Sequence, residues 1–150
     1  MPQMNKGGKY IFGMSVIRKD GSVQFPTQAV EEYHIADEGK AYLFTGSKST
    51  GGFCVTRRGL LLPSKLGKIL EETLALRDYT AKQGEFISSK GRSYCWTEIT
   101  TSGQIILTEE MMNFLQIKPG MSLLSIRSSD IAFTMGAKGP LLEKAETTWA

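Results

Sequence analysis

Two stretches of this chain, about eighty residues apart, follow the same order of residue types. Each begins with a turn whose second residue is glycine, at Asp20-Gly21 and at Ser102-Gly103, and continues into a short stretch typical of a strand that ends at Phe25 or Leu107. A helical pattern follows in both, with apolar residues three or four positions apart. This repetition constrains the fold more than composition does, because two copies of one backbone have to share their packing.

The positions that correspond between the two copies are apolar or glycine, whereas the polar positions differ. The matched pairs are Gly21 with Gly103, Val30 with Met112, Tyr33 with Leu115, Ile35 with Ile117, and Gly39 with Gly120. This pattern is expected if both copies keep one backbone and contribute to one core. The surfaces of the two copies are then free to differ in charge.

Length and composition are those of a globular protein. The chain has 150 residues, 41% of them hydrophobic and 22% charged, which fits one domain or two small halves that share a core. No apolar run approaches the roughly 18 residues of a membrane helix, and the first residues lack the apolar segment of a signal peptide. Cys54 and Cys95 are too few for a disulfide framework. We expect a cytoplasmic protein with reduced thiols and no membrane contact.

The net charge of +3 is unevenly distributed along the chain. Residues 1–62 hold eight Lys or Arg against five Asp or Glu, whereas residues 63–80 and 81–150 are each balanced. Four basic residues and no acidic residue precede Asp20. A basic N-terminal arm can follow a phosphate backbone, although a solvated terminus is an equally good interpretation.

The residue pattern predicts a mostly-β chain with short helices. β-branched and aromatic residues or strict alternation predict strands at 10–17, 22–25, 40–44, 52–56, 93–99, 104–107, 123–126 and 131–134. Short helices are predicted after Thr27 and after Thr108, each capped by that threonine. A longer amphipathic pattern predicts one helix from Ser64 to Tyr79.

Two sets of residues carry a resemblance to a known family. They are Ser15-Val-Ile-Arg-Lys-Asp-Gly-Ser-Val-Gln-Phe-Pro26 with Ile35 and Gly39, and Gly103-Gln-Ile-Ile-Leu-Thr108 with Ile117-Lys-Pro-Gly120. Each set resembles the AbrB/MazE/SpoVT swapped-hairpin domain, in which two units interlace their hairpins into one β-barrel. The resemblance implies a first unit at 9–62, a connecting helix at 63–80 and a second unit at 91–139. Together they would form one pseudo-dimeric domain, similar to that of MraZ-type proteins.

The resemblance also implies a function, because many members of this family bind double-stranded DNA as transcriptional regulators or antitoxins. The implied contacts are Arg18 and Lys19, which enter the first turn, and Lys9 on the N-terminal arm. Lys48, Lys90 and Arg92 are further candidates for phosphate contacts. A symmetric basic surface would need the first copies of two chains, and hence a homo-oligomer. We expect no catalytic residue, cofactor or metal ligand, and no enzymatic activity.

Several positions depart from the family pattern. Family DNA binders often have arginines after the strand and in the first helix, where this chain has Gln24 and Gln28, followed by Glu31-Glu32. The second copy has Thr100-Thr101-Ser102 at its turn and Glu109-Glu110 at the start of its helix. Carboxylates that face phosphate repel it. The alternative function is therefore a protein- or small-ligand-binding module that keeps the fold and does not bind DNA.

Other residues suggest different chemistry. Tyr94, Trp96 and Phe114 could line a ligand site or pack in the core. Gly21-Ser22 is the dipeptide at which a pyruvoyl-dependent decarboxylase with a related barrel cleaves itself, and a full-length intact mass would exclude this interpretation. The glycine-rich loop 46–52 lacks the Gly-Lys-Ser/Thr of a phosphate-binding loop. His34, the only histidine, is expected at a helix end rather than at a catalytic centre.

Overall fold

The computed structural model describes residues 3–4, 10–45, 50–139 and 142–143, and within these ranges the chain is mostly β with short helices, as predicted. The strands are β1 (Gln3–Met4), β2 (Tyr10–Val16), β3 (Ser22–Gln24), β4 (Lys40–Thr45), β5 (Phe53–Thr56), β6 (Ile87–Ser89), β7 (Arg92–Glu98), β8 (Gln104–Ile106), β9 (Ser122–Arg127) and β10 (Phe133–Gly136). The helices are α1 (Thr27–Tyr33), α2 (Arg58–Leu61), α3 (Lys68–Glu72), α4 (Leu74–Arg77) and α5 (Glu109–Leu115). Within the described ranges, no helix is long and apolar enough to cross a membrane.

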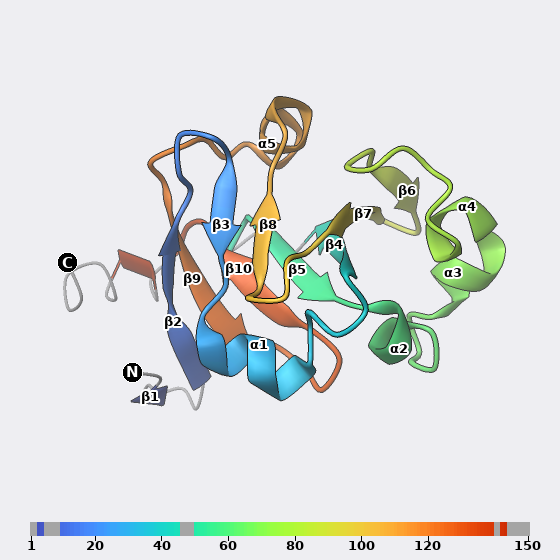
Figure 1. Cartoon of the computed structure of the whole chain (residues 1–150), viewed down its shortest axis with the longest axis horizontal. Helices are drawn as coiled ribbons and strands as arrows, with labels where there is room; N and C mark the ends of the chain where they lie inside the picture. The colour runs from blue at the N-terminus through green and yellow to red at the C-terminus, as the bar shows by residue number, and fades with distance from the viewer. Residues whose placement is uncertain (1–2, 5–9, 46–49, 140–141, 144–150) are drawn as a thin grey trace.

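The strands form one open sheet and one short ribbon. The sheet has eight antiparallel strands in the order β1-β2-β9-β10-β5-β4-β7-β6, and β3 and β8 form the separate two-stranded ribbon. Figure 1 shows the ribbon in front of the sheet, with α1 below it and α5 above it. The described part of the chain is therefore mostly β, and its strands do not form a closed β-barrel. The short strands β1 and β6 pair with β2 and β7, so that β2 and β7 do not meet to close a barrel.

Strands of one half pair with strands of the other half. β2 pairs with β9, and its counterpart in the second half, β7, pairs with β4. The ribbon joins β3 to β8 with Val23 opposite Ile105, and β5 pairs with β10 with Cys54 opposite Thr134. If each strand is replaced by its counterpart in the other half, the same set of pairings results. The strand pairing is therefore two-fold symmetric. Neither half can keep its strand pairing without the other.

The sheet carries an apolar core on each face, which we call the ribbon face and the back face. Because side chains alternate along a strand, Leu43 and Val55 face the ribbon, whereas Tyr42 and Cys54 on the same strands face the back. The ribbon and helices α1 and α5 cover the ribbon face. The segment that contains α2, α3 and α4 covers one part of the back face.

The segment predicted as a single helix from Ser64 to Tyr79 is divided between α3 and α4. The division is at Thr73, whose φ of −122° and ψ of 82° are not helical. The two helices place Leu70 and Leu76 in the back-face core. A straight helix presents one stripe of side chains, so packing against a twisted sheet favours the division. The neighbouring region 80–90, which lies outside the predicted strands and helices, contains β6.

Candidate nucleic-acid interface

The turn between β2 and β3 holds two exposed cations on a tight backbone. Gly21 has a φ of 84°, and its N–H donates to the Arg18 carbonyl at 2.9 Å. The Asp20 carboxylate accepts a hydrogen bond from the Ser22 N–H at 2.9 Å, and hydrogen bonding from Ser22 lowers the pKa of this carboxyl. In the described part of the chain, neither Arg18 nor Lys19 forms an ion pair. Asp20 therefore stabilises the turn. Arg18 donates from Nη1 to Gln104 Oε1 at 3.4 Å, and neither cation lies within ion-pair distance of a described carboxylate.

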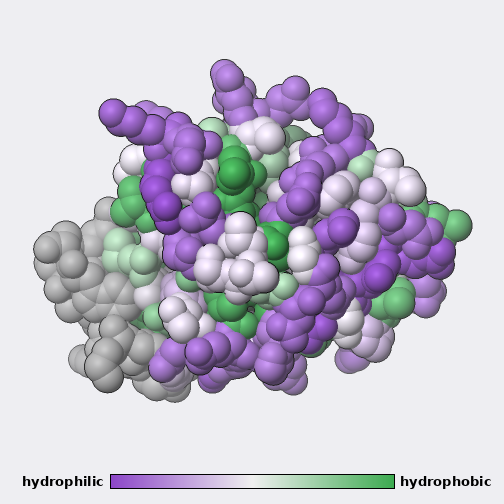
Figure 2. Space-filling model, viewed as in Figure 1, coloured by the Kyte–Doolittle hydropathy of each residue, from purple (hydrophilic) through white to green (hydrophobic). Residues whose placement is uncertain are grey.

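An open groove of about 530 Å³ separates this turn from α5. Lys19 and Lys118 both line the groove, together with the apolar side chains of Ile106 and Met112. Figure 2 shows this region at the top of the molecule, where hydrophilic side chains project on both sides of an apolar strip. The groove therefore combines two lysines with two carboxylates, Asp20 and Glu109, and with apolar side chains, of which Ile106 is 55% exposed.

Lys118 is a site residue that the sequence analysis did not single out. It belongs to the turn Ile117-Lys-Pro-Gly120, which the repeat predicts as backbone structure only. The contact between this turn and the β2–β3 turn joins the two halves: Gly120 donates from its N–H to the Ile17 carbonyl at 2.7 Å. The spacing of residues within one repeat does not indicate which residues of the other repeat they will contact.

The four glutamates that were expected to oppose DNA binding lie in different environments. Glu109, the first residue of α5, lines the same groove as Lys19. Glu110 lies 3.6 Å from the Lys82 ammonium, and Glu32 forms a bidentate ion pair with Arg127. Glu31 is exposed on α1, at the other end of the ribbon. Glu109 is thus the glutamate of this group that borders the basic turn.

The equivalent turn between β7 and β8 has the same backbone and no cation. Gly103 has a φ of 89°, and its N–H donates to the Thr100 carbonyl at 2.9 Å. The hydroxyls of Thr100 and Ser102 lie 3.0 Å apart, and the Gln24 amide donates to the Ser102 carbonyl at 2.8 Å. Because the ribbon is antiparallel, the two turns lie at its opposite ends. One end of the ribbon is basic and the other is neutral.

The structure does not bring the other predicted cations to the basic turn. Lys90 and Arg92 belong to the β6–β7 hairpin, and β7 is five positions from β2 in the sheet, or roughly 24 Å at the usual strand spacing. The Lys90 ammonium lies 3.9 Å from the Glu72 carboxylate. The Arg92 guanidinium lies over the Phe44 ring, 5.8 Å from its centroid. Lys9 and Lys48 lie outside the described residues.

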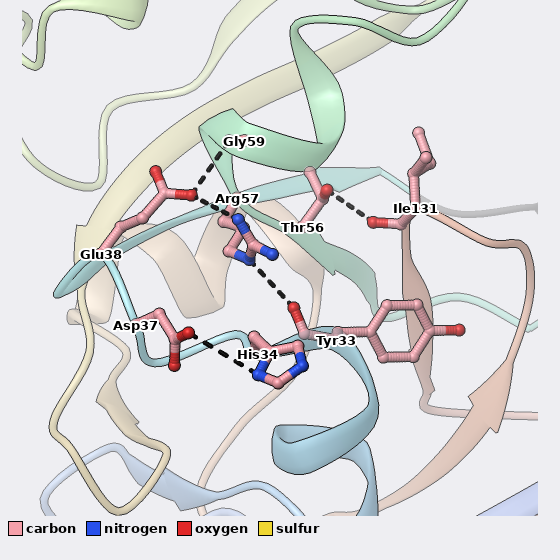
Figure 3. Close-up of polar contacts among 8 residues, drawn as sticks. All are labelled: Tyr33, His34, Asp37, Glu38, Thr56, Arg57, Gly59 and Ile131. Atoms are coloured by element: carbon pink, nitrogen blue, oxygen red, sulfur yellow. Dashed lines mark hydrogen bonds and ion pairs between the residues drawn. The ribbon is translucent and has the colours of Figure 1, made fainter.

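A polar cluster at the C-terminal end of α1 involves a different arginine (Figure 3). Arg57 donates from Nε to the Tyr33 carbonyl at 2.9 Å and from Nη1 to Glu38 Oε2 at 2.8 Å. The same carboxylate oxygen accepts from the Gly59 N–H at 3.0 Å. His34 ends α1 with a φ of 49°, as expected for a helix boundary, and its Nδ1 lies 3.6 Å from Asp37. These groups bind one another, so the cluster joins α1 to α2 rather than forming a ligand site.

The predicted aromatic group does not form one site. Tyr94 and Trp96 are buried in the back-face core, whereas Phe114 on α5 is 49% exposed and stacks on Phe86, with ring centroids 4.3 Å apart. Cys54 and Cys95 are free and buried, and burial raises the pKa of the Cys95 thiol to about 12. Across the described residues, no three His, Cys, Asp or Glu side chains are arranged to hold a metal ion.

Comparison with known proteins gave no match. No protein-family model matches this chain, and neither a curated protein nor a solved structure matches it. The resemblance to the swapped-hairpin family therefore depends on the residues of the two repeats. The function has to be argued from the geometry of this chain.

Proposed function

We propose that this chain is a DNA-binding transcriptional regulator that contacts double-stranded DNA through the β2–β3 turn. The observation that carries the proposal is the pair of cations on that turn, Arg18 and Lys19, which are exposed and form no ion pair with a described carboxylate. Lysine and arginine side chains that neutralise phosphates release bound counterions, and this release supplies most non-specific affinity. An arginine can in addition form two hydrogen bonds to a guanine edge in the major groove.

The exchange of strands between the halves supports the family resemblance behind this proposal. In a swapped-hairpin pair, each unit completes its sheet with strands of the other, and β2 with β9 and β7 with β4 have that relation here. One chain would then be a pseudo-dimer with a single basic turn. We therefore propose a homo-oligomer in which two chains present their β2–β3 turns to one duplex.

Glu109 has a defined role in this proposal. Its carboxylate lines the same groove as Lys19 and would repel a phosphate that approaches the turn. The expected result is modest affinity for arbitrary DNA, because the local charge is mixed. Sequence-specific contacts would then have to supply the remaining affinity.

The main test removes the two cations of the turn. The variant Arg18→Gln/Lys19→Gln should bind a DNA duplex more weakly than the wild type, as measured by fluorescence anisotropy at several salt concentrations. Each lost phosphate contact makes the slope of log affinity against log salt less negative by about 0.9. Loss of both contacts should therefore make the slope less negative by about 2 per chain. The matched control is Lys65→Gln/Lys68→Gln, which removes two exposed cations outside the groove and should change the slope much less.

A second variant tests the proposal in the opposite direction. Glu109→Gln removes a carboxylate that lines the same groove as Lys19 and should raise the affinity for DNA. Binding that is absent or insensitive to salt in the wild type, or that weakens equally in the control, would contradict the proposal. Either result would favour the alternative, a binding module for a protein or small ligand that has no DNA contact.

A further inference from the structure

The back face of the sheet is depressed where the two halves meet. A row of side chains crosses this face through four cross-strand pairs: Tyr94 with Phe44, Phe44 with Cys54, Cys54 with Thr134, and Thr134 with Ile126. The outer members of the row are large and the two central members, Cys54 and Thr134, are small. The small side chains leave a cavity of about 460 Å³ above them. This volume lies within the range of about 300–1,000 Å³ that is usual for small-molecule sites.

The walls of this cavity are mostly apolar. Leu66, which precedes α3, lines one side, and Ile131 and Ala132, which precede β10, line another. On the floor, the Cys54 thiol and the Thr134 hydroxyl lie 3.4 Å apart and bind each other. The floor and these walls therefore carry no charge that would repel an apolar ligand or an anion.

Two arginines also line the cavity, and they differ in their partners. Arg127 is held by Glu32, to which its Nε donates at 2.7 Å, and its guanidinium lies over Tyr10, 4.4 Å from the ring centroid. Arg92 forms no ion pair with any described carboxylate, and its guanidinium lies over the Phe44 ring at the edge of the floor. Of the two arginines that line the cavity, Arg92 is therefore the one without a described carboxylate partner.

We propose that this cavity binds a small organic anion, whose apolar body covers Cys54 and Thr134 and whose acidic group pairs with Arg92. A guanidinium binds carboxylate, phosphate and sulfonate groups through two parallel hydrogen bonds, so the shared chemistry is an apolar acid rather than one named compound. The site is independent of DNA binding, because it lies on the sheet face opposite the ribbon. A ligand here contacts β4 and β5 of one half and β9 and β10 of the other, so its binding stabilises the junction between the halves.

The test uses two fluorescent probes of similar size and different charge. Anilinonaphthalene sulfonate is an aromatic anion, and N-phenylnaphthylamine is its neutral analogue. With the full chain, the sulfonate should bind at one saturable site and raise the melting temperature. Arg92→Gln should weaken sulfonate binding by about tenfold or more, as expected for a lost charge-assisted pair, and should leave binding of the neutral probe unchanged.

Two further variants separate the cavity from the general surface. Thr134→Met fills the depression and should weaken binding of both probes. Lys90→Gln removes a cation of the same hairpin that lies near Glu72 and outside the cavity, and should weaken neither. The proposal is overturned if the wild type shows no saturable sulfonate binding. It is also overturned if Arg92→Gln, whose exposed side chain can be removed without disturbing the core, binds the sulfonate like the wild type.

Discussion

The β2–β3 turn and the β7–β8 turn have the same backbone and different surface chemistry. In both, a glycine with positive φ donates to the carbonyl three residues earlier and accepts a hydrogen bond from the opposite strand of the ribbon. The first turn adds Arg18 and Lys19 to this backbone, whereas the second adds the hydroxyls of Thr100 and Ser102. The comparison separates two roles. The glycine and the hydrogen bonds of the ribbon determine the backbone of the turn, and the other residues of the turn determine what it can bind.

The helices that follow the two turns differ in a similar way. Both end in a left-handed residue, His34 in α1 and Gln116 in α5. They begin differently, because the Thr108 hydroxyl accepts from the Met111 N–H at 3.1 Å, whereas α1 begins after Pro26 with no side-chain cap. The prediction that Thr27 caps α1 is therefore wrong. A repeated helix can keep its packing positions when its first residues have changed.

The largest expected effect distinguishes the two glycines. A Cβ at Gly21 would collide with the backbone carbonyl of Leu107, whereas a Cβ at Gly103 would collide with the Val30 side chain, which can move. We expect Gly21→Ala to lower the free energy of unfolding by about 3 kcal/mol and Gly103→Ala by about half as much, measured by urea denaturation. Adding Val30→Ala should show coupling with Gly103→Ala and none with Gly21→Ala. Equal costs and equal coupling would mean that the two turns are not constrained differently.

A smaller effect is expected from the polar cluster of the first half. Arg57→Ala leaves the Tyr33 carbonyl and the Glu38 carboxylate without their partner, and the Arg57 and Glu38 side chains are only 18% and 24% exposed. We expect a loss of about 2 kcal/mol in unfolding free energy. The control is Arg77→Ala, which breaks the exposed pair with Asp78 and should cost much less than Arg57→Ala, because water and salt screen an exposed pair. A cost for Arg57→Ala no greater than that of the control would show that the cluster does not join α1 to α2.

The smallest effect concerns the start of each helix. Thr108→Ala removes the hydroxyl that caps α5 and should cost about 1 kcal/mol in thermal or chemical unfolding. Thr27→Ala, at the start of α1, should cost nearly nothing, since no side-chain cap is present there. Similar losses from both substitutions would indicate that the two helices begin in the same way.

Much of the local structure could be predicted because its causes are local. Alternating apolar residues and glycine turns predict β2, β3, β7 and β8 with small boundary errors, and the paired positions of the repeat predict one shared arrangement. These local patterns could not show whether the sheet closes into a barrel, because the edge strands β1 and β6 decide whether β2 and β7 can pair with each other. The residues of β1 and β6 are few and largely polar, so periodicity gives no signal for strands that form only by pairing with β2 and β7.

The candidate site was predicted in part. Arg18 and Lys19 lie on the predicted turn, but Lys118 and Glu109 reach it from the other half of the chain. Arg92, predicted as a phosphate contact, lies instead beside a cavity on the back face. These positions depend on which strand of one half lies next to which strand of the other.

The sequence by itself determined the repeated unit, its turns and the difference in charge between its copies, because these depend on residue type and spacing within about thirty residues. The tertiary structure alone decided that the sheet stays open, that the segment at 64–79 divides into short helices, and that Cys54 and Thr134 lie side by side at the junction. The physical reason is that strand pairing and packing join residues far apart in the chain, and the free energy of such contacts depends on the partner as much as on the residue itself.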